Sequence, residues 1–399
     1  MKEKKFWLRP RHRLIRNLAY LVLYPYSRLK FGITIEKFKE QEDRPYLIVL
    51  NHQTAFDQFF VGMAFKGPFY YMATEDIFSL GWISHVLRYV VAPIPIRKQT
   101  TDIQAVKTCI KVAKEGGTIA IAPEGNRTYD GRTVYMNPTI APLAKKLNMP
   151  LVIFRIEGGY GVQPRWTDKV RKGKMRAYVH QVIQPEEMAS MTNEELFQRI
   201  RDGLYVNEAS ASGTFVHKKS AEYLERVVYV CPNCGLSVFE SHNDIIRCKT
   251  CARQVRYLPT KELQGVGFDF PFRFVADWYD YQCDFINHLD PGDHLDTPLF
   301  RDTVRLSEVI VFQRKNVLRK QAQLALYGDR ITIDDDLVLP FDELSTVTCL
   351  GRNKLNIYHG NMVYQIKGDK RFNALKYMNL YHRYKNAKAG DGNGKFLGL

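Results

Sequence analysis

The chain has 399 residues, more than one ordinary hydrophobic core holds, so two or three domains are expected. Its composition, 45% hydrophobic and 25% charged, is that of a folded chain and excludes a low-complexity protein. The net charge is +16, and half of this excess lies in residues 1–40, where eleven Lys or Arg stand against three Glu. Such a basic excess indicates an anionic partner, either a nucleic acid or an anionic membrane face.

The first predicted element is a helix within residues 1–30, whose segment 10–30 reads PRHRLIRNLAYLVLYPYSRLK. Basic ends around an apolar, Tyr-rich middle favour a helix that lies in the lipid headgroup region. The alternative is a first helix packed on its own domain. No apolar run reaches the roughly 18 to 20 residues that span a bilayer, and Leu18–Tyr26 lacks the cleavage site of a secretory signal. We therefore expect a peripheral protein on the cytoplasmic face of the membrane, without a spanning helix.

Strands and helices alternate from about residue 45 to 185, which predicts an α/β domain over residues 31–215. Its sheet should be mainly parallel and flanked by helices, since the strands are short and apolar. Residues 101–115 are predicted to form a helix that stops at Gly116-Gly117. In such sheets functional residues gather at the carboxyl ends of strands. The predicted strands are Tyr46–Leu50, Phe69–Met72, Ile94–Ile96, Thr118–Ala122, Leu151–Arg155 and Arg176–Val182.

A histidine and an aspartate follow the first of these strands, as His52 and Asp57. The two side chains can meet if His52 lies in the loop and Asp57 in the first turn of the next helix. A carboxylate bonded to one imidazole nitrogen fixes the tautomer and leaves the other nitrogen free to take a proton. Neither Ser nor Cys stands beside the pair as a nucleophile, so such a base would activate a hydroxyl group of the substrate. The alternative is a structural pair at a strand end.

A second candidate site follows another strand, in the segment IAPEGNRT at residues 121–128. Glu124, Gly125 and Arg127 combine an acid, a position for close backbone approach and a guanidinium. Arginine suits the binding of a phosphate through two parallel hydrogen bonds. The segment APIPIRK at residues 92–98 adds Arg97 on a proline-bearing stretch. Ordinary surface loops are the alternative reading of both segments.

In this order, these segments resemble the sequence blocks of the glycerolipid acyltransferase family, typified by 1-acylglycerol-3-phosphate acyltransferases. NHQTAFD is similar to the Asn-His-(four residues)-Asp block, and APIPIR to the arginine-bearing second block. APEGNRT is similar to the Phe-Pro-Glu-Gly-Thr-Arg-Ser block, and NMPLVIF, with Pro150, to the fourth. The resemblance covers roughly residues 10–205.

The resemblance implies roles for six residues. His52 would deprotonate the acceptor hydroxyl and Asp57 would orient His52, while the acceptor's phosphate-bearing end would be held by Arg97, Glu124, Gly125 and Arg127. The donor would be a fatty acyl thioester of acyl carrier protein or coenzyme A, attacked directly, and no other organic cofactor is expected. The acceptor implied first is the lysophospholipid 1-acylglycerol-3-phosphate, in membrane phospholipid synthesis.

The chain departs from the family pattern at several positions. Ile96 stands where an aspartate often precedes the second-block arginine, and Asn126 and Thr128 replace the usual Thr and Ser. Thr74 and Glu75 occupy positions where lysines are common in members that act on lysophosphatidic acid. Another lysophospholipid or a glycolipid is therefore the alternative acceptor.

Four of the seven cysteines form two C-x-x-C pairs thirteen residues apart, Cys231/Cys234 and Cys248/Cys251. This spacing predicts a zinc ribbon over residues 225–257 in which four thiolates close a tetrahedral site. Because no coordination position stays open, the zinc would be structural. The pattern suits zinc in a reducing cytoplasm better than a disulfide framework, and a metal-free pair of knuckles is the alternative.

The last third of the chain is predicted to be a helical connector followed by an all-β unit. Residues 258–300 form the connector, with one aromatic helix near Phe274–Leu289. Residues 301–390 hold short alternating segments with hairpin turns, such as Gly328-Asp329, and end in a helix at Phe372–Lys388. This order of elements is similar to the pleckstrin-homology-like superfamily.

The rival hypothesis is a binding protein, either a zinc ribbon that recognises nucleic acid or an inactive lipid-binding scaffold. The basic charge, however, lies in the N-terminal segment, and residues 224–258 hold only five basic residues. We therefore do not expect nucleic acid as a partner. An inactive scaffold would not be expected to keep the His–Asp pair together with both phosphate arginines, so an enzyme is favoured.

Overall fold

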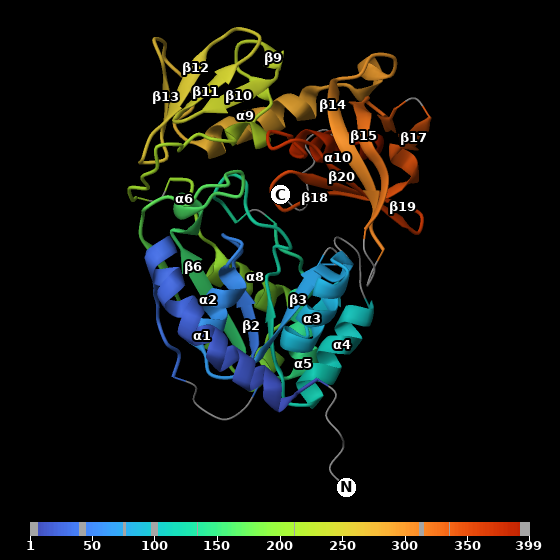
Figure 1. Cartoon of the computed structure of the whole chain (residues 1–399). Coiled ribbons are helices and arrows are strands. Elements are labelled where there is room, and N and C mark those ends of the chain that lie inside the picture. The colour runs from blue at the N-terminus through green and yellow to red at the C-terminus, as the bar shows by residue number, and fades with distance from the viewer. Residues whose placement is uncertain are drawn as a thin grey trace.

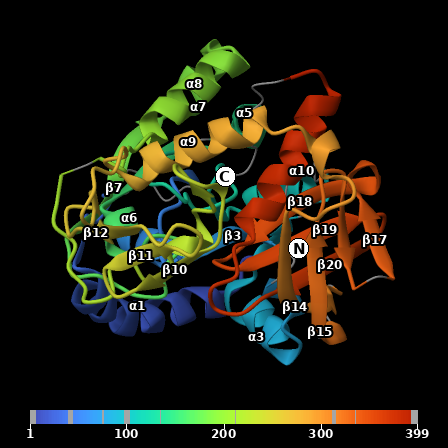
Figure 2. The same ribbon diagram turned by 90° about the horizontal axis from the view of Figure 1, so that it is seen from above.

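The computed structural model describes residues 7–39, 45–74, 77–96, 103–133, 135–210, 212–310, 315–334 and 336–391. Within these ranges the chain forms two seven-stranded sheets, a four-stranded sheet and a two-stranded sheet. The first seven-stranded sheet and its helices occupy one end of the molecule, and the other sheets stand side by side at the opposite end (Figures 1 and 2).

The first sheet, called here the α/β sheet, has the strand order β1-β7-β6-β2-β5-β3-β4. All neighbouring pairs are parallel except β6 with β7, so β1 and β7 run opposite to the other five strands. The prediction of a mainly parallel sheet is confirmed. The short strand β1 was missed. The strands are β1 Ile33–Ile35, β2 Leu47–Leu50, β3 Phe69–Thr74, β4 Ile94–Ile96, β5 Thr118–Ile121, β6 Leu151–Glu157 and β7 Met175–Ile183.

Helices cover both faces of the α/β sheet. In β2, Leu47 and Val49 pack into a core cluster with residues of α4, α5 and α8, whereas Ile48 and Leu50 pack with residues of α1 and α2. Burial on both faces explains why β2 is apolar throughout instead of alternating. The elements are α1 Pro10–Phe31, α2 Asp57–Ala64, η1 Ile77–Ser79, α3 Trp82–Val91, α4 Ile103–Lys114, α5 Ile140–Leu147, α6 Gly159–Val162, α7 Pro185–Ser190 and α8 Asn193–Leu204. None of the helices in the described ranges is long and apolar enough to cross a membrane.

The cysteine-rich segment forms the small sheets. An antiparallel four-stranded sheet, called here the ribbon sheet, runs in the order β10-β11-β12-β13, and β8 pairs with β9 beside it. Strand β13 lies beyond residue 257, inside the stretch predicted as a connector. The elements are η2 Leu224–Arg226, β8 Val230–Cys231, β9 Gly235–Leu236, β10 Phe239–His242, β11 Ile245–Cys248, β12 Gln254–Tyr257 and β13 Leu263–Gly265.

The second seven-stranded sheet, called here the C-terminal sheet, is antiparallel throughout in the order β17-β16-β15-β14-β20-β19-β18. Helix α10 follows it and packs on β18 and β19, so the predicted all-β unit with a C-terminal helix is confirmed. The elements are α9 Val275–His288, η3 Pro291–His294, β14 Phe300–Glu308, β15 Asn316–Leu326, β16 Arg330–Ile333, β17 Leu337–Pro340, η4 Phe341–Glu343, β18 Leu344–Leu350, β19 Lys354–His359, β20 Met362–Lys367 and α10 Leu375–Lys388.

One hydrophobic core joins the ribbon sheet, α9 and the C-terminal sheet. Helix α9 is a central part of this core, because Trp278 Nε1 donates to the carbonyl of Val230 at 2.8 Å and Gln282 Oε1 accepts from the N–H of Tyr229 at 2.7 Å. Tyr129 and Trp166, which come from the α/β part of the chain, belong to the same core. The C-terminal sheet is therefore packed, through shared side chains, onto the loops at one edge of the α/β sheet.

Candidate active site

The first candidate residues lie at the carboxyl end of β2. Asn51 is buried there, and its side-chain amide exchanges two hydrogen bonds with the backbone of Ile156 on β6, at 2.8 and 2.7 Å. This pairing fixes the end of β2 against its neighbour strand. Helix α2 begins at Asp57, so His52 lies in the connecting loop and Asp57 in the first helical turn, the placement that brings the two side chains together.

His52 and Asp57 are in direct contact: His52 Nδ1 lies 2.7 Å from Asp57 Oδ2. The Asp57 carboxylate also accepts from the backbone N–H groups of Gln53 and Thr54, at 2.6 and 2.9 Å, and from the Thr54 hydroxyl at 2.7 Å. A carboxylate only accepts, so Nδ1 carries the proton and Nε2 presents a lone pair. Burial lowers the pKa of His52 below its ordinary value; Asp57 opposes that shift, and Arg127 and Arg165 add to it. The imidazole is therefore neutral at neutral pH, as a base must be.

Glu124 lies close to the same loop because β5 is the parallel neighbour of β2. Its Oε1 accepts from the backbone N–H of His52 at 2.9 Å. Burial, with a smaller contribution from the charge of Asp57, raises the pKa of Glu124 to about 8. Gly125 follows with φ +68°, a left-handed backbone in which a larger side chain would be strained although the space beside it is open. This hydrogen bond from the backbone of His52 to Glu124 thus joins the two predicted motifs, the one that holds His52 and the one that holds Glu124.

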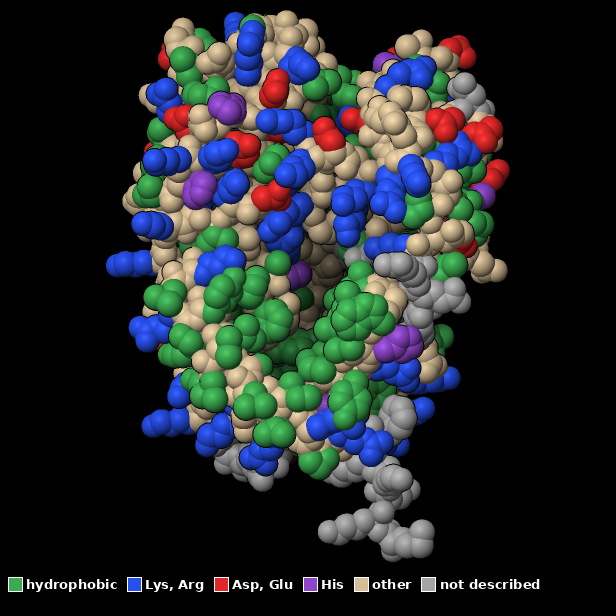
Figure 3. Space-filling model, viewed as in Figure 1, with side chains coloured by type: hydrophobic (Ala, Val, Ile, Leu, Met, Phe, Trp, Pro, Cys, Tyr) green, Lys and Arg blue, Asp and Glu red, His purple; other side chains and the backbone are tan. Residues whose placement is uncertain are grey.

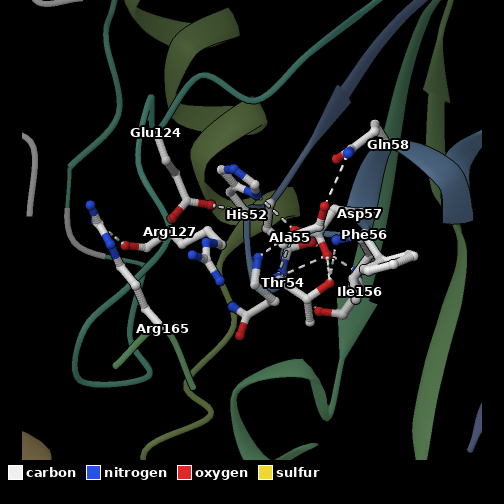
Figure 4. Close-up of polar contacts among 12 residues, drawn as sticks. His52, Thr54, Ala55, Phe56, Asp57, Gln58, Glu124, Arg127, Ile156 and Arg165 are labelled. Carbon is white, nitrogen blue, oxygen red and sulfur yellow. Dashed lines mark hydrogen bonds and ion pairs between the residues drawn. The ribbon is translucent and has the colours of Figure 1, made fainter. Parts of the chain in front are cut away.

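Arg127 is the next predicted residue, and its side chain is only 8% exposed. Its Nη1 is buried and has no hydrogen-bond partner among the described residues. Burial, together with the positive charges of Arg165 and Arg352, lowers the pKa of Arg127 to about 9. Figure 4 shows Glu124, Arg127 and Arg165 gathered on one side of His52 and the Asp57 network on the other. A guanidinium whose Nη1 lacks a partner within the described ranges thus lies close to the candidate base.

Two predicted positions lie outside what the structure describes. Arg97 is beyond the described residues, although β4, which precedes it, is parallel to β3 and leaves the sheet at the same edge as β2 and β5. Glu75 is also outside the described residues, and the side chain of Thr74 is not described. Sequence reasoning in turn missed Asn51, Thr54 and Arg165. Asn51 and Thr54 stand within the first motif, whereas nothing in the sequence around Arg165 indicated its role.

The four cysteines of the two C-x-x-C pairs come together in the ribbon. Their sulfur atoms all lie within 4.8 Å of one another, and the Sγ atoms of Cys231 and Cys251 are 3.8 Å apart. Four thiolates bound tetrahedrally to zinc at about 2.3 Å would be separated by about 3.8 Å, so the donor set fits a metal of this type. Gly235, at φ +72°, supplies the left-handed turn after the first pair, Cys231 and Cys234. The cluster could hold a metal ion.

Comparison with known proteins places the candidate base inside a recognised segment. The family model described as Acyltransferase matches residues 32–157, a range that includes His52, Asp57, Glu124 and Arg127. This segment of the chain is therefore similar to acyltransferases in sequence as well as in the order of its motifs.

Two proteins of similar sequence are 1-acyl-sn-glycerol-3-phosphate acyltransferases. The chloroplastic 1-acyl-sn-glycerol-3-phosphate acyltransferase LPAT1 of Arabidopsis thaliana is 24% identical over 190 residues, which are 46% of this chain and 51% of that protein. The 1-acyl-sn-glycerol-3-phosphate acyltransferase of Bacillus subtilis is 26% identical over 165 residues, 41% of this chain and 78% of that protein. The chain thus spans about half the length of the plant relative. The crystal structure of the 1-acyl-sn-glycerophosphate (LPA) acyltransferase PlsC from Thermotoga maritima aligns with a TM-score of 0.41 and 21% identity, covering 50% of this chain and 82% of that one.

Proposed function

We propose that the protein is an O-acyltransferase that moves a fatty acyl group from an acyl thioester to the hydroxyl group of a lysophospholipid. The first candidate acceptor is 1-acylglycerol-3-phosphate, and the donor is the thioester of acyl carrier protein or coenzyme A. The observation that carries this proposal is the 2.7 Å contact between His52 and Asp57, inside the segment that matches the acyltransferase family.

The proposed mechanism is a direct transfer with His52 as general base. Nε2 takes the proton of the acceptor hydroxyl as its oxygen attacks the thioester carbonyl, and a C–O bond forms. The C–S bond then breaks, the thiolate leaves, and the proton on His52 passes to the sulfur, which gives the ester and a free thiol. Among the described residues, no Ser or Cys side chain hydrogen-bonds His52, which favours direct attack over an acyl-enzyme intermediate.

The residues around the base would bind and position the acceptor. Arg127 offers an unpaired buried Nη1 to the acceptor phosphate, and Arg97 would supply a second contact. Glu124 and Gly125 would complete the acceptor site, and Glu124 also accepts from the backbone N–H of His52. Replacement of Arg127 by Gln should therefore raise the KM for a phosphate-bearing acceptor and leave the KM for the donor nearly unchanged.

We further propose that α1 and α3 dock the protein on the cytoplasmic face of a membrane. The two helices pack together, and the Arg11 guanidinium of α1 lies 4.0 Å from the ring centre of Tyr89 on α3. Apolar side chains gather on this side of the molecule, below a hollow whose upper margin is basic (Figure 3). The exposed large apolar residues of the two helices are Leu14, Leu18, Leu21, Val22, Tyr26, Leu29, Trp82, Ile83, Val86, Tyr89 and Val91. A contiguous patch of this kind marks an interaction surface.

The remaining parts of the chain are assigned structural roles within this proposal. Cys231, Cys234, Cys248 and Cys251 would bind a zinc ion that stabilises the ribbon and takes no part in the reaction. We propose a division into a membrane helix at 1–30, an acyltransferase domain at 31–215, a ribbon at 225–257, a connector at 258–300 and a pleckstrin-homology-like β domain at 301–390.

The proposal is tested by incubating the purified protein, on anionic vesicles, with acyl-coenzyme A or acyl carrier protein thioesters and a panel of acceptors. The panel holds 1-acylglycerol-3-phosphate, lysophospholipids with larger headgroups, a lysoglycolipid and monoacylglycerol. Formation of diacylated product that depends on His52 is expected with a lysophospholipid. The second candidate is a glycolipid acceptor, suggested by Thr74 and Glu75 where related enzymes often have lysines. Absence of transfer to every acceptor would refute the proposal.

A further inference from the structure

The C-terminal sheet reaches the candidate active site through Arg165. This side chain is 1% exposed, and its Nη1 donates to the carbonyl of Arg127 at 2.8 Å while its Nη2 lies 3.3 Å from Asn126 Oδ1. The same guanidinium donates from Nε to the carbonyl of Gly351 at 2.8 Å and from Nη2 to that of Cys349 at 3.2 Å. One buried arginine thus ties the loop that carries Arg127 to the turn between β18 and β19.

The next residue on that turn is Arg352, whose side chain is 30% exposed. Its Nη1 lies 3.2 Å from Asp168 Oδ1, and the same oxygen accepts from the buried Arg226 at 2.9 Å. One carboxylate is therefore shared between two guanidinium groups, and the Nε of Arg352 is buried without a hydrogen-bond partner. Arg352 therefore carries a positive charge and an Nε donor that no other described residue satisfies.

The positive charges around Arg127 are only partly balanced by the acids close to it, since the charge of Asp57 favours the charged form of Arg127 less than burial and the neighbouring arginines disfavour it. Asp57 is committed to His52 and to the backbone of its loop, and burial keeps Glu124 largely protonated at neutral pH. Arg165 bonds the carbonyls of both Arg127 and Gly351, so Arg127 and Arg352 lie on segments that one side chain holds together, and the charges of Arg165 and Arg352 both lower the pKa of Arg127. A buried, unpaired guanidinium is costly, and an anion bound between these groups would remove that cost.

We propose that Arg352, supplied by the C-terminal sheet, joins Arg127 in binding the anionic headgroup of the acceptor. The inference rests on the proposed function and deepens it, since it makes the acceptor a lysolipid with a phosphate group and makes the C-terminal sheet part of the acceptor site. Arg165 is a positioning residue, because its hydrogen bonds hold the loop of Arg127 and the turn of Arg352 at a fixed separation. A glycolipid without an anionic group would offer no negative charge to Arg127 or to Arg352.

The test compares Arg352→Gln with Arg330→Gln. Arg330 is a suitable control because it lies on the same sheet, is 28% exposed and likewise pairs with one aspartate, Asp329, at 2.7 Å. For 1-acylglycerol-3-phosphate, Arg352→Gln should raise the KM about ten-fold or more, the scale of a lost hydrogen bond to a charged group, with kcat largely kept. Arg352→Lys should restore part of the loss, and the KM for monoacylglycerol should not change.

Melting curves establish that each variant is folded. An Arg352→Gln KM equal to that of Arg330→Gln, or equal losses on both acceptors, would overturn the inference.

A binding measurement with the soluble headgroup, sn-glycerol 3-phosphate, separates this inference from the proposed function. Glycerol 3-phosphate should raise the Tm of the wild-type protein and of Arg330→Gln more than that of Arg352→Gln. If the wild type showed this dependence but transferred no acyl group, the headgroup site would stand and the proposed function would fall. Stabilisation by inorganic phosphate, combined with an acceptor KM that does not respond to Arg352→Gln, would identify a free-phosphate site and overturn the inference.

Discussion

His52 Nδ1 lies 2.7 Å from Asp57 Oδ2, and Asp57 is held by further hydrogen bonds from the backbone of its own loop. The aspartate is therefore fixed before any substrate binds, and it fixes the ring of His52 in turn. Because β2 ends at Leu50 and α2 begins at Asp57, the loop 51–56 brings His52 to the first turn of the helix. The orientation of Nε2 follows from this arrangement.

The first prediction concerns catalysis by this pair. His52→Ala should lower kcat by about 10²-fold or more with little change in KM, since a general base acts only in the transition state. Asp57→Asn should cause most of the same loss, because an amide also donates and allows the wrong tautomer. Steady-state kinetics on vesicles measure both effects, and His242→Ala, an exposed histidine of the ribbon sheet, is the control. Near-wild-type turnover by a folded His52→Ala protein would reduce the pair to a structural contact.

The pH dependence of kcat/KM should show an acid limb with its midpoint below 6.5. Burial lowers the pKa of His52, and activity requires the neutral imidazole, so activity is present at neutral pH and is lost as the pH falls through the lowered pKa. Asp57 raises the pKa of His52, so its replacement by Asn should lower that pKa further. The acid limb of the residual activity of Asp57→Asn should therefore lie at a still lower pH. A midpoint above 6.5 would contradict this assignment.

Glu124 should make stability depend on pH. Its pKa is raised from 4.5 to about 8 by burial, so the folded protein binds a proton more tightly than the unfolded chain does. The free energy of unfolding of the wild type, relative to Glu124→Gln, should therefore fall as the pH rises from about 4.5 to about 8. Urea unfolding at pH 5 and pH 8 measures the difference, with Glu186→Gln on α7 as the control. Parallel changes in all three proteins would show that Glu124 does not titrate as proposed.

Contacts between residues close together in the chain could be predicted from the sequence, whereas contacts between distant residues could not. His52 and Asp57 are five residues apart, so a strand end and a helix start were enough to predict their contact. Arg165 contacts Arg127 across 38 residues and Gly351 across 186. The residues next to an arginine in the sequence do not indicate whether it will be buried between two distant parts of a fold. The small strand β1, three residues long, was missed because so short an apolar run carries little periodicity.

The cysteine cluster gives a prediction about metal content. The protein purified without chelator should contain one zinc per chain, and Cys231→Ser should lower that content and destabilise the ribbon. The core shared by the ribbon, α9 and the C-terminal sheet should transmit part of this loss to the C-terminal half, whereas the α/β sheet has its own core clusters and should stay folded. Atomic emission and limited proteolysis measure the two effects, with Cys283→Ser as the control outside the cluster. Full zinc content in Cys231→Ser/Cys248→Ser would exclude the four-cysteine site.

The last prediction concerns the membrane-facing surface of α1 and α3. Leu21, Val22 and Trp82 are 69%, 67% and 73% exposed, so their replacement by Asp should not disturb the packed side of either helix. Burial of one such side chain in an apolar environment contributes roughly 1.5–3 kcal/mol, so loss of all three should weaken binding to anionic vesicles at least about ten-fold. The added negative charge also repels anionic lipid. Binding of the wild type should itself become weaker as the salt concentration rises, because salt screens the basic residues. Val338→Asp, at a position 47% exposed on β17, adds one negative charge on another surface and should bind as the wild type does. Vesicle sedimentation measures these affinities. Equal binding by the triple variant and Val338→Asp would mean that another surface, the C-terminal sheet being the first to test, anchors the protein to lipid.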